Sequence, residues 1–332
     1  MDKIKFAIPK GSLEKATSEF FAKSGFKIGG TERTYRPSIN DPQIELKVLR
    51  PQEIPVFVSE GLQDLGITGE DWVKENRADV EVLQNLEYGK IRLVIAVPKT
   101  CKNETMGEFM ESIWSQGKNF RISTEYLNIA SEYLKSTSQY KKRFGDADPM
   151  LVTPWWKKGD NSRAKIFLSF GATEAKPPEN SDAIMDVTET GTTIEANNLK
   201  IIDTVLKSSA ILIANKKAME DPEKREKIHD ILALLKGVVD GSKRIHIFVN
   251  VKKSNLQKLL TELPALKNPT ISPLADETLV SVNTVIEKDS LIELLPKIRK
   301  LAQGLVVYEP RQVLALDEIV KREENLCKNK AQ

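Results

Sequence analysis

Short apolar runs alternate with amphipathic stretches along the first hundred residues. Ile4–Ile8 and Ile91–Val97 are apolar runs that each stop at a proline, a pattern typical of buried strands. Between them, residues 12–25 carry apolar side chains at helical spacing, from Ser12 at the N-cap position to Gly25 at the C-cap position. Strands that alternate with helices in this way predict an α/β layer with a largely parallel sheet.

The same alternation restarts after Pro98. Residues 120–136 predict a strand, a turn and a helix, and further strands are predicted before Asp186 and around Ser208-Ser209. The polar segment 140–165 predicts a long loop or hairpin. Its Trp155-Trp156 pair is interpreted as a loop anchor or contact surface, with adenine binding as the alternative.

These patterns predict three parts of the chain. Lobe I comprises residues 1–98 and 187–225, and lobe II comprises residues 99–186, so that the chain crosses between the lobes twice. Two crossings place a cleft between the lobes, the usual position for a ligand. Residues 226–332 are predicted to form a linker helix and a βαββαβ module of about 80 residues, the order of a ferredoxin-like sandwich. Such modules often bind effectors or mediate assembly, an expectation by fold analogy alone.

Composition excludes several classes of function. The 50 basic and 47 acidic residues give a net charge of +3, and no basic block suggests nucleic acid as a partner. No apolar run approaches the roughly 20 residues that span a bilayer, and the N-terminal apolar run is too short for a signal peptide. The two cysteines, Cys101 and Cys327, lie outside any CxxC pair, so we expect no disulfide framework and a reducing cytoplasmic location.

Histidine is nearly absent from the chain. The two that occur, His229 and His246, are predicted on a helix and on a strand, and we interpret both as structural. The chain therefore has too few residues for a metal site built from His and Cys, or for a catalytic triad with a histidine base. The chemistry must use carboxylates, Lys and Arg side chains, hydroxyls and backbone amides.

The segment 183–199, AIMDVTETGTTIEANNL, ends a predicted strand with two acids and a loop of hydroxyls. Asp186 lies at the carboxyl end of this strand, where ligands bind in α/β sheets. Thr190-Gly191-Thr192-Thr193 offers consecutive amides and three hydroxyls, and Gly191 permits positive φ and a close backbone approach. A helical turn over 194–196 would direct its N-terminus at the loop, as in phosphate sites.

The two acids, Asp186 and Glu189, indicate which anion fits this loop. Carboxylates would repel a bare phosphate, but they can accept hydrogen bonds from ribose hydroxyls or hold a Mg²⁺ that also binds the phosphate. We therefore expect a sugar phosphate. A Thr/Gly turn capped by Asp186 is the structural alternative, and the local pattern does not decide between the two.

Three other turns next to predicted strands could also contact a ligand. Lys10 and Gly11 lie between a strand and a helix N-terminus, which suits an anion. Asp64 and Gly69 flank a short strand, and Glu174 follows another. Each has an ordinary alternative as well: a solvated turn lysine, a tight turn in a packed strand, and an exposed turn glutamate.

Taken together, seven segments resemble the long form of the ATP phosphoribosyltransferase family. They are AIPKGSL at 7–13, RPQEIPVFVSEGLQDLGITGED at 50–71, LEYGKIRLVIAVP at 86–98, STEYLNIASEYL at 123–134, GATEA at 171–175, DAIMDVTETGTTIEANNL at 182–199 and LKNPTISPLAD at 266–276. The resemblance runs from about residue 4 to residue 312, and the segments are specific together and in this order.

The resemblance implies a fold and an activity. It implies two periplasmic-binding-protein-like lobes that form a catalytic cleft, followed by a C-terminal ferredoxin-like regulatory domain. The implied reaction is Mg²⁺-dependent: N1 of ATP attacks C1′ of phosphoribosyl pyrophosphate and expels pyrophosphate, the first step of histidine biosynthesis. Feedback inhibition by histidine and a homohexamer built from dimers are implied as well.

The resemblance also implies roles for individual residues. Asp186 is placed by the ribose, and Glu174 matches a cleft position. The loop for the 5-phosphate of phosphoribosyl pyrophosphate comprises Glu189, Thr190, Gly191, Thr192 and Thr193. The positions on the nucleotide and pyrophosphate side are Lys10, Gly11, Arg50, Asp64, Gly69 and Arg92. The positions around the histidine effector are Asn250, Leu266 and Thr270. No protein-only metal site is implied, because Mg²⁺ binds with the substrate phosphates.

The chain departs from the family pattern at several positions. Ser12 stands where the family usually has Arg in PKGRL, so a cation that could contact a nucleotide phosphate is missing. GATEA at 171–175 stands where GSVEA is common, Asn250 stands where some members have Asp, and the segment 140–165 is longer than usual.

An alternative function is a non-catalytic ligand-binding or regulatory relative with the same two lobes. The phosphate loop is intact, which favours the enzyme. A dinucleotide-dependent oxidoreductase is disfavoured because no GxGxxG follows the first strand.

Overall fold

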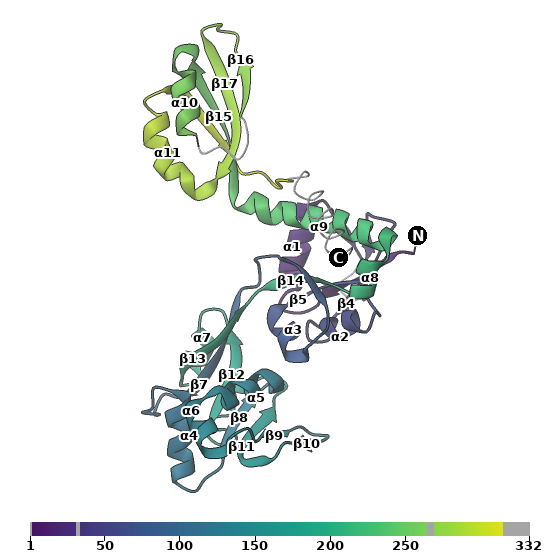
Figure 1. The fold of residues 1–332 in the computed structure, drawn as a ribbon, viewed down its shortest axis with the longest axis vertical. Coiled ribbons are helices and arrows are strands. Elements are labelled where there is room, and N and C mark those ends of the chain that lie inside the picture. The colour runs from purple at the N-terminus through teal and green to yellow at the C-terminus, as the bar shows by residue number, and fades with distance from the viewer. Residues whose placement is uncertain (1, 31–33, 264–268, 315–332) are drawn as a thin grey trace, which may run out of the picture. The chain divides into compact units, whose positions relative to one another are not determined.

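The computed structural model describes residues 2–30, 34–263 and 269–314 (Figure 1). They form two compact units, and each is described by itself. The two-lobe unit comprises Lys5–Glu14 and Lys47–Ala218. The C-terminal unit comprises the described residues of Met1–Ile4, Lys15–Leu46 and Met219–Gln332.

Lobe I is built on a five-stranded sheet of order β4-β1-β5-β14-β6. Its elements are β1 (Ile4–Pro9), β4 (Ile44–Leu49), α2 (Ile54–Ser59), β5 (Leu65–Gly69), α3 (Glu70–Asn76), β6 (Glu81–Asn85) and β14 (Ala210–Ala214). β1 and β5 run parallel, whereas β14 is antiparallel to both of its neighbours. Fully buried Ile54 and Val58 of α2 pack against Ala7 of β1 and against β14, which forms the core of this lobe.

Lobe II is built on a seven-stranded sheet of order β10-β9-β11-β8-β12-β7-β13. Its strands are β7 (Ile91–Pro98), β8 (Phe120–Thr124), β9 (Pro149–Val152), β10 (Lys157–Lys158), β11 (Asn161–Leu168), β12 (Ala183–Thr188) and β13 (Leu199–Ser208). Its helices are α4 (Met106–Ser115), α5 (Leu127–Ser136), α6 (Ser138–Phe144), the 3-10 turn Thr173–Ala175 and α7 (Thr192–Ala196). β9, β11, β8 and β12 are parallel, as predicted. β7 runs antiparallel to its neighbours β12 and β13, so β13 has the same direction as β12.

The chain changes sheets at points that differ from the predicted limits. β7 and β13 form a long antiparallel ladder with each other, from Pro98 opposite Leu199 to Ile91 opposite Ser208. Both therefore belong to the seven-stranded sheet, although the sequence analysis assigned them to lobe I. The sheets change between Leu86 and Ile91, and again between Ser208 and Ala210, rather than at 98 and 187. An apolar strand pattern shows that a strand is buried, but it does not show which sheet the strand joins.

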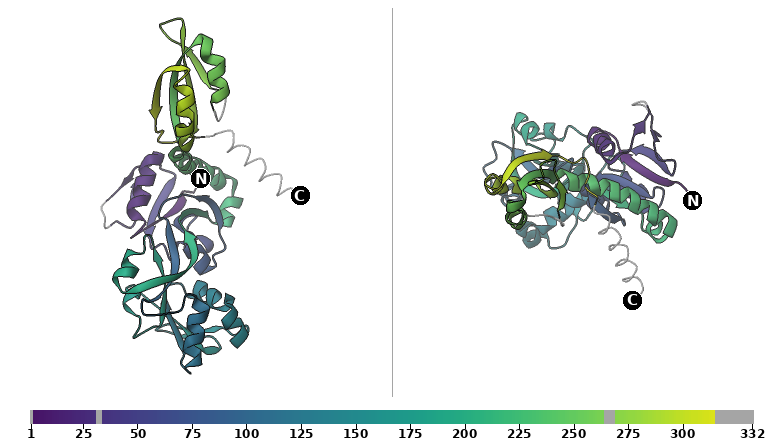
Figure 2. Two further views of the ribbon diagram at one scale, coloured as in Figure 1. Left: turned by 90° about the vertical axis from the view of Figure 1, so that its left-hand side faces the viewer. Right: turned by 90° about the horizontal axis from the view of Figure 1, so that it is seen from above.

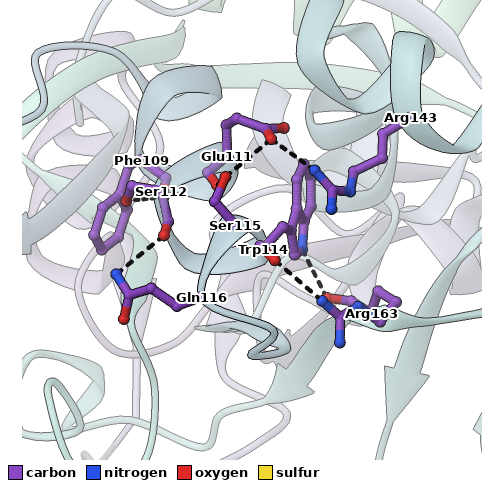
Figure 3. Close-up of polar contacts among 8 residues, drawn as sticks. All are labelled: Phe109, Glu111, Ser112, Trp114, Ser115, Gln116, Arg143 and Arg163. Atoms are coloured by element: carbon purple, nitrogen blue, oxygen red, sulfur yellow. Dashed lines mark hydrogen bonds and ion pairs between the residues drawn. The ribbon is translucent and has the colours of Figure 1, made fainter.

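Trp114 of α4 organises the core of lobe II (Figure 3). Its side chain is 1% exposed, and its indole N–H donates to the carbonyl of Arg163 at 2.9 Å. Phe144 meets the ring edge-on at 4.9 Å, and the Arg143 guanidinium lies 5.9 Å from the ring centroid. Arg143 also pairs with Glu111 at 2.6 Å (Figure 3), so that α4, α6 and β11 are held around one indole.

The segment 140–165 contains more regular structure than the sequence predicted. α6 occupies its first residues, and β9 and β10 form an antiparallel hairpin further along. Trp155 lies in the turn of this hairpin with 72% of its surface exposed, edge-on to Phe170 at 5.8 Å.

The C-terminal unit contains the predicted ferredoxin-like module. The module comprises β15 (Arg244–Lys252), α10 (Leu256–Glu262), β16 (Thr270–Pro273), β17 (Leu279–Glu287), α11 (Leu291–Ile298) and β18 (Ala302–Tyr308). The other elements of the unit are α1 (Glu14–Ser24), β2 (Ile28–Gly29), β3 (Ser38–Ile39), α8 (Lys216–Glu220) and α9 (Pro222–Ser242). The four-stranded sheet has the order β16-β17-β15-β18 and is antiparallel throughout. α10 and α11 cover one face of it (Figures 1 and 2). Alternate residues of β15, from Ile245 to Val251, are buried in the core with these helices, which confirms the βαββαβ prediction.

Within the described ranges, no helix is long and apolar enough to cross a membrane. Cys101 is a half-buried free thiol, and Cys327 lies outside the described residues.

Replacement of Trp114 by Ala tests this description of the lobe II core. We expect Trp114→Ala to lower the free energy of unfolding by about 3–5 kcal/mol, because it removes a fully buried ring and its hydrogen bond. Urea unfolding followed by circular dichroism measures this. Arg143→Ala is the matched control at the same ring. It should cost at most about 1 kcal/mol, because the Arg143–Glu111 pair is largely exposed. Equal effects of the two variants would contradict the assignment.

Candidate functional site

The loop between β12 and α7 carries the hydroxyls singled out in the sequence. Gly191 has a φ of 93°, in the left-handed region that favours glycine, and its N–H donates to Thr188 Oγ1 at 2.8 Å. Thr190 Oγ1 and Thr192 Oγ1 are 2.8 Å apart at the start of α7. The loop side chains exposed to solvent are those of Glu189, Thr190, Thr192 and Thr193. An ordered backbone thus presents hydroxyls and a short helix start outward.

Asp186 lies at the end of the buried part of β12, and its pKa is raised. The net shift takes the pKa from its ordinary value of 3.8 to about 6, and burial is the largest cause. The charges of Glu174 and Glu125 raise it further, whereas hydrogen bonds from the Val187 N–H, at 2.7 Å, and from the Thr173 side chain lower it. Three carboxylates therefore act on one another here, and they make a centre of negative potential. Such a centre stabilises positive charge that develops on a ligand.

A cavity of about 250 Å³ adjoins this centre. Val187, the neighbour of Asp186, lines it together with Glu125, so the cavity and the carboxylates are continuous. Its other lining residues are Lys10, Gly11, Ser12, Leu13, Arg50, Pro51, Gln52, Gly69, Asp71, Trp72, Gly89, Ile91 and Tyr126. The cavity therefore combines two cationic side chains, two aromatic rings and backbone groups. This combination suits a ligand that is both aromatic and anionic.

Asp71 lines this cavity and is 4% exposed. One carboxylate oxygen accepts from Ser208 Oγ at 2.5 Å and the other from the Tyr126 hydroxyl at 2.7 Å. Trp72 stacks on the Tyr126 ring at 4.4 Å. A Cβ on Gly69 would lie 2.2 Å from Asp71 Oδ1, so only glycine leaves room for this carboxylate. Burial and the Asp71 charge together raise the pKa of Tyr126, so this hydroxyl stays protonated and donates.

Glu75 lies one turn further along α3 and is 7% exposed. Its carboxylate accepts from the N–H groups of Asn128 and Ile129 at 2.9 and 3.0 Å, and so caps the N-terminus of α5. Asn128 returns a hydrogen bond from its amide to the Glu75 carbonyl at 2.9 Å. α5 has no side-chain cap at its own N-cap residue, Tyr126. A lobe I helix therefore fixes the start of a lobe II helix, next to the cavity.

The structure brings most of the predicted residues together but separates two of them. Lys10, Gly11, Arg50 and Gly69, four of the six residues predicted on the nucleotide and pyrophosphate side, line one cavity. Asp64 does not line it: it precedes β5 at the opposite end of that strand from Gly69, and its carboxylate accepts from the Lys5 N–H at 2.9 Å.

Arg92 also lies outside the cavity lining. It is the ladder partner of Thr188 on β12, at the loop that holds Gly191. The structure thus places Arg92 beside the loop of Glu189–Thr193 rather than in the cavity that Lys10 and Arg50 line.

Sequence reasoning missed Asp71, Trp72, Glu125 and Tyr126 as lining residues. Glu125 and Tyr126 directly follow β8, and Asp71 and Trp72 follow β5, so all four come just after the carboxyl end of a strand. The same rule that selected Asp186 would have selected them. Their pairing across the lobes has no signal in the sequence.

Two of the three predicted effector residues lie on one sheet face of the C-terminal unit. Asn250 on β15 is the ladder partner of Ser281, and Thr270 on β16 is the partner of Asn283. Alternation along β15 and β17 puts these side chains on the face away from α10 and α11. Asn283 Oδ1 on this face is buried and has no hydrogen-bond partner among the described residues. Leu266 lies outside the described residues.

Metal ligands are not grouped in the part of the chain that the structure describes. No three His, Cys, Asp or Glu side chains come close enough there to hold a metal ion. A divalent cation at this site would therefore draw its ligands largely from substrate phosphates.

Comparison with known proteins gives a consistent result. A family model described as ATP phosphoribosyltransferase matches residues 50–237, and one described as HisG, C-terminal domain, matches residues 242–311. The ATP phosphoribosyltransferase of Solibacter usitatus (strain Ellin6076) is 39% identical over 317 residues, which cover 94% of this chain and 99% of that protein. The ATP phosphoribosyltransferase of Chlorobaculum parvum (strain DSM 263 / NCIMB 8327) is 36% identical, over 94% of this chain and 97% of that protein.

One solved structure is similar over the larger part of the chain. A chain of the ATP phosphoribosyl transferase (HisG:HisZ) complex from Thermotoga maritima is 25% identical, with a TM-score of 0.54. The match covers 71% of this chain and 98% of that one.

The raised pKa of Asp186 predicts a pH-dependent effect of its replacement. Because the folded protein holds the proton more tightly than the unfolded chain, stability falls as pH rises from the ordinary pKa of 3.8 through about 6. Asp186→Asn removes this loss. We expect the variant to melt at a higher temperature than the unmodified protein at about pH 8, with a smaller difference at about pH 5. Calorimetry at both pH values measures this, and a difference that does not change with pH would contradict the assignment.

Proposed function

This chain belongs to the ATP phosphoribosyltransferase family, and we propose that it transfers the phosphoribosyl group of phosphoribosyl pyrophosphate to N1 of ATP. The reaction releases pyrophosphate and is the first step of histidine biosynthesis. The observation that carries the proposal is the continuity of the two half-sites. The Asp186 loop and the cavity with Lys10 and Arg50 meet at Val187 and Glu125, so two anionic substrates can lie end to end.

The first half-site suits phosphoribosyl pyrophosphate. Its 5-phosphate would bind the exposed groups of Glu189–Thr193, where the amides and the hydroxyls of Thr190, Thr192 and Thr193 donate. Asp186 would accept hydrogen bonds from the ribose hydroxyls, with Glu174 beside it. Arg92, next to Thr188, adds a positive charge at the same loop.

The second half-site suits ATP. Lys10 and Arg50 would bind phosphates, and the stacked rings of Trp72 and Tyr126 offer an apolar wall for a base. Ser12 lines this cavity where the family pattern usually has Arg, so Lys10 and Arg50 carry more of the phosphate binding here.

The reaction itself needs no protein nucleophile. The bond from N1 of adenine to C1′ forms while the bond from C1′ to the pyrophosphate oxygen breaks, and pyrophosphate leaves with that electron pair. Positive charge develops on the ribose ring in between. The carboxylates of Asp186, Glu174 and Glu125 stabilise this charge electrostatically, and the two half-sites supply orientation. A protein with two histidines can perform such chemistry.

Mg²⁺ is part of the proposal as a cofactor. Phosphoribosyl pyrophosphate is strongly charged, and among the described residues no three Asp, Glu, His or Cys side chains are grouped to hold a metal ion, so we expect substrate oxygens to provide most of the ligands. When bound, it would neutralise charge on the leaving pyrophosphate.

We further propose a cytoplasmic homohexamer built from dimers. The resemblance to the long form supports this, as do the exposed apolar side chains of the C-terminal unit. Ile292 of α11 is 82% exposed, and Val306 and Tyr308 of the edge strand β18 are 51% and 59% exposed. Such surfaces commonly take part in assembly.

Histidine is proposed as the feedback inhibitor, bound at the open sheet face of the C-terminal unit. Asn250 and Thr270 share this face. Asn283 adds a buried oxygen that no described residue hydrogen-bonds, and this oxygen could accept from a ligand amine. Leu266 remains a predicted contact outside the described residues.

An assay for N1-phosphoribosyl-ATP tests the proposed activity. The purified protein with ATP, phosphoribosyl pyrophosphate and Mg²⁺ should form this product, followed by its near-ultraviolet absorbance. Chelation of Mg²⁺ should abolish the signal. Absence of product with Mg²⁺ present and histidine removed would leave the non-catalytic relative as the function.

The double variant Thr192→Val with Thr193→Val tests the phosphate loop. Loss of hydrogen bonds to a charged phosphate should weaken phosphoribosyl pyrophosphate binding by about tenfold or more, and leave ATP binding unchanged. Isothermal calorimetry measures both. Thr204→Val, at an exposed threonine of the edge strand β13, is the control for the substitution itself. Unchanged affinity for phosphoribosyl pyrophosphate would exclude this role of the loop.

Histidine inhibition is tested at the same sheet face. We expect histidine to inhibit the unmodified enzyme, and Asn283→Leu, which removes the unpaired acceptor, to raise the inhibitory concentration by about fivefold or more without a change in uninhibited rate. Steady-state assays with added histidine measure this. If histidine neither binds nor inhibits, the domain serves assembly only.

A further inference from the structure

One residue of the cavity lining carries a polar atom without a partner. Gln52 lies in the turn between β4 and α2 and lines the cavity together with Trp72 and Tyr126. Its side-chain oxygen Oε1 is buried, and no described residue hydrogen-bonds it. A buried acceptor without a donor destabilises the protein, so a donor from a ligand would explain why this oxygen is kept here.

Glu125 determines which end of the Gln52 amide is left over. Gln52 Nε2 donates to Glu125 Oε2 at 3.5 Å. A carboxylate can only accept, so the NH₂ group must face Glu125, and the oxygen is the free end. The terminal torsion of a glutamine is broad, so a small rotation of the amide presents this oxygen to a ligand in the cavity.

The backbone of Gln52 is fixed and tied to that of Trp72. Thr68 Oγ1 donates to the Pro51 carbonyl at 2.7 Å. The side-chain amide of Asn76 donates to the Gln52 carbonyl at 2.9 Å and to the Trp72 carbonyl at 2.8 Å. One amide group thus joins the residue with the free acceptor to a residue of the aromatic wall, so that a base beside the wall lies within reach of the acceptor.

The position of Gln52 indicates which edge of a nucleotide it meets. The two half-sites meet at Val187 and Glu125, and Glu125 is the residue that Gln52 contacts. In the proposed reaction, N1 of adenine must reach this end of the cavity. The amino group N6 is bonded to the carbon next to N1, and it is a hydrogen-bond donor. The free acceptor and this donor therefore come to the same place.

We propose that Gln52 is a specificity-determining residue whose Oε1 accepts a hydrogen bond from the N6 amino group of adenine. This inference rests on the proposed function. A purine with a carbonyl at this position would place an acceptor against an acceptor, and a purine without any group there would leave Oε1 unpaired. Gln52 therefore favours adenine over both.

A chemical double-mutant cycle tests the contact. The two probes are ATP and purine riboside 5′-triphosphate, which has hydrogen in place of the amino group. The unmodified protein should bind ATP about tenfold more tightly than the analogue. Gln52→Met keeps the length of the side chain and removes the acceptor. It should bind ATP about tenfold more weakly and the analogue within about threefold of the unmodified protein, so that the preference disappears. Isothermal calorimetry with Mg²⁺ measures all four affinities.

Gln63→Met is the matched control. Gln63 is a lobe I glutamine with 6% exposure, and its Oε1 is also buried without a partner among the described residues. It does not line the cavity, so Gln63→Met should keep the preference for ATP. The inference is overturned if Gln52→Met keeps the preference or weakens both nucleotides equally, because a shift of Glu125 or a general loss of stability would then explain the effect. Loss of the preference in Gln63→Met would overturn it as well.

The calorimetry needs no phosphoribosyl pyrophosphate, which separates this inference from the proposed function. A preference for ATP that depends on Gln52, without product in the transferase assay, would support the adenine contact and overturn the function. Product formation by a protein that binds both nucleotides equally would overturn the inference and leave the function intact. Absence of binding of either nucleotide would overturn the inference.

Discussion

Two buried carboxylates on one face of α3 join the lobes, and the cavity depends on them. Asp71 and Glu75 are one helical turn apart, so both side chains point the same way. Asp71 accepts from Ser208 and Tyr126, and Glu75 caps α5. Burial of a charge is costly without partners, and these carboxylates have partners from β13 and α5. The pairs therefore require the lobes to meet at this place, with Glu125 and Tyr126 between them.

This junction explains how a protein nearly without histidine can catalyse a group transfer. In the proposed function, the two half-sites for anionic substrates lie next to each other, with the carboxylates of Asp186, Glu174 and Glu125 near the place where they meet. Orientation and a preorganised negative potential then supply what a nucleophile or a base supplies elsewhere. Burial, and to a lesser extent the charges of Glu174 and Glu125, raises the pKa of Asp186. The hydrogen bond from the Val187 N–H partly offsets this effect.

Much of the fold followed from the sequence because its signals are local. Apolar runs ended by proline predicted β1 and β7, and the βαββαβ order predicted the C-terminal module. The assignment of β7 and β13 to lobe I was wrong. The sequence pattern predicts two strands but not their partners. Only the ladder of β7 with β12 and that of β13 with β7 show the sheet to which they belong. The sequence also did not predict that Asp64, at the amino end of β5, lies outside the cavity. A residue pattern at a strand end does not show which end of the strand faces a ligand.

The sequence by itself determined the chemistry at each strand end. The Thr-Gly-Thr-Thr loop after Asp186, the cation at Lys10 and the scarcity of histidine are all local or compositional facts. Tertiary structure decided which of these groups act together. It brought Glu125, Glu174 and Asp186 close enough for their charges to interact, and it placed Arg92 opposite Thr188, next to the loop of Glu189–Thr193. The physical reason is that hydrogen bonds and Coulomb interactions depend on distance in space. Spacing along the chain fixes that distance only within one helix, strand or turn.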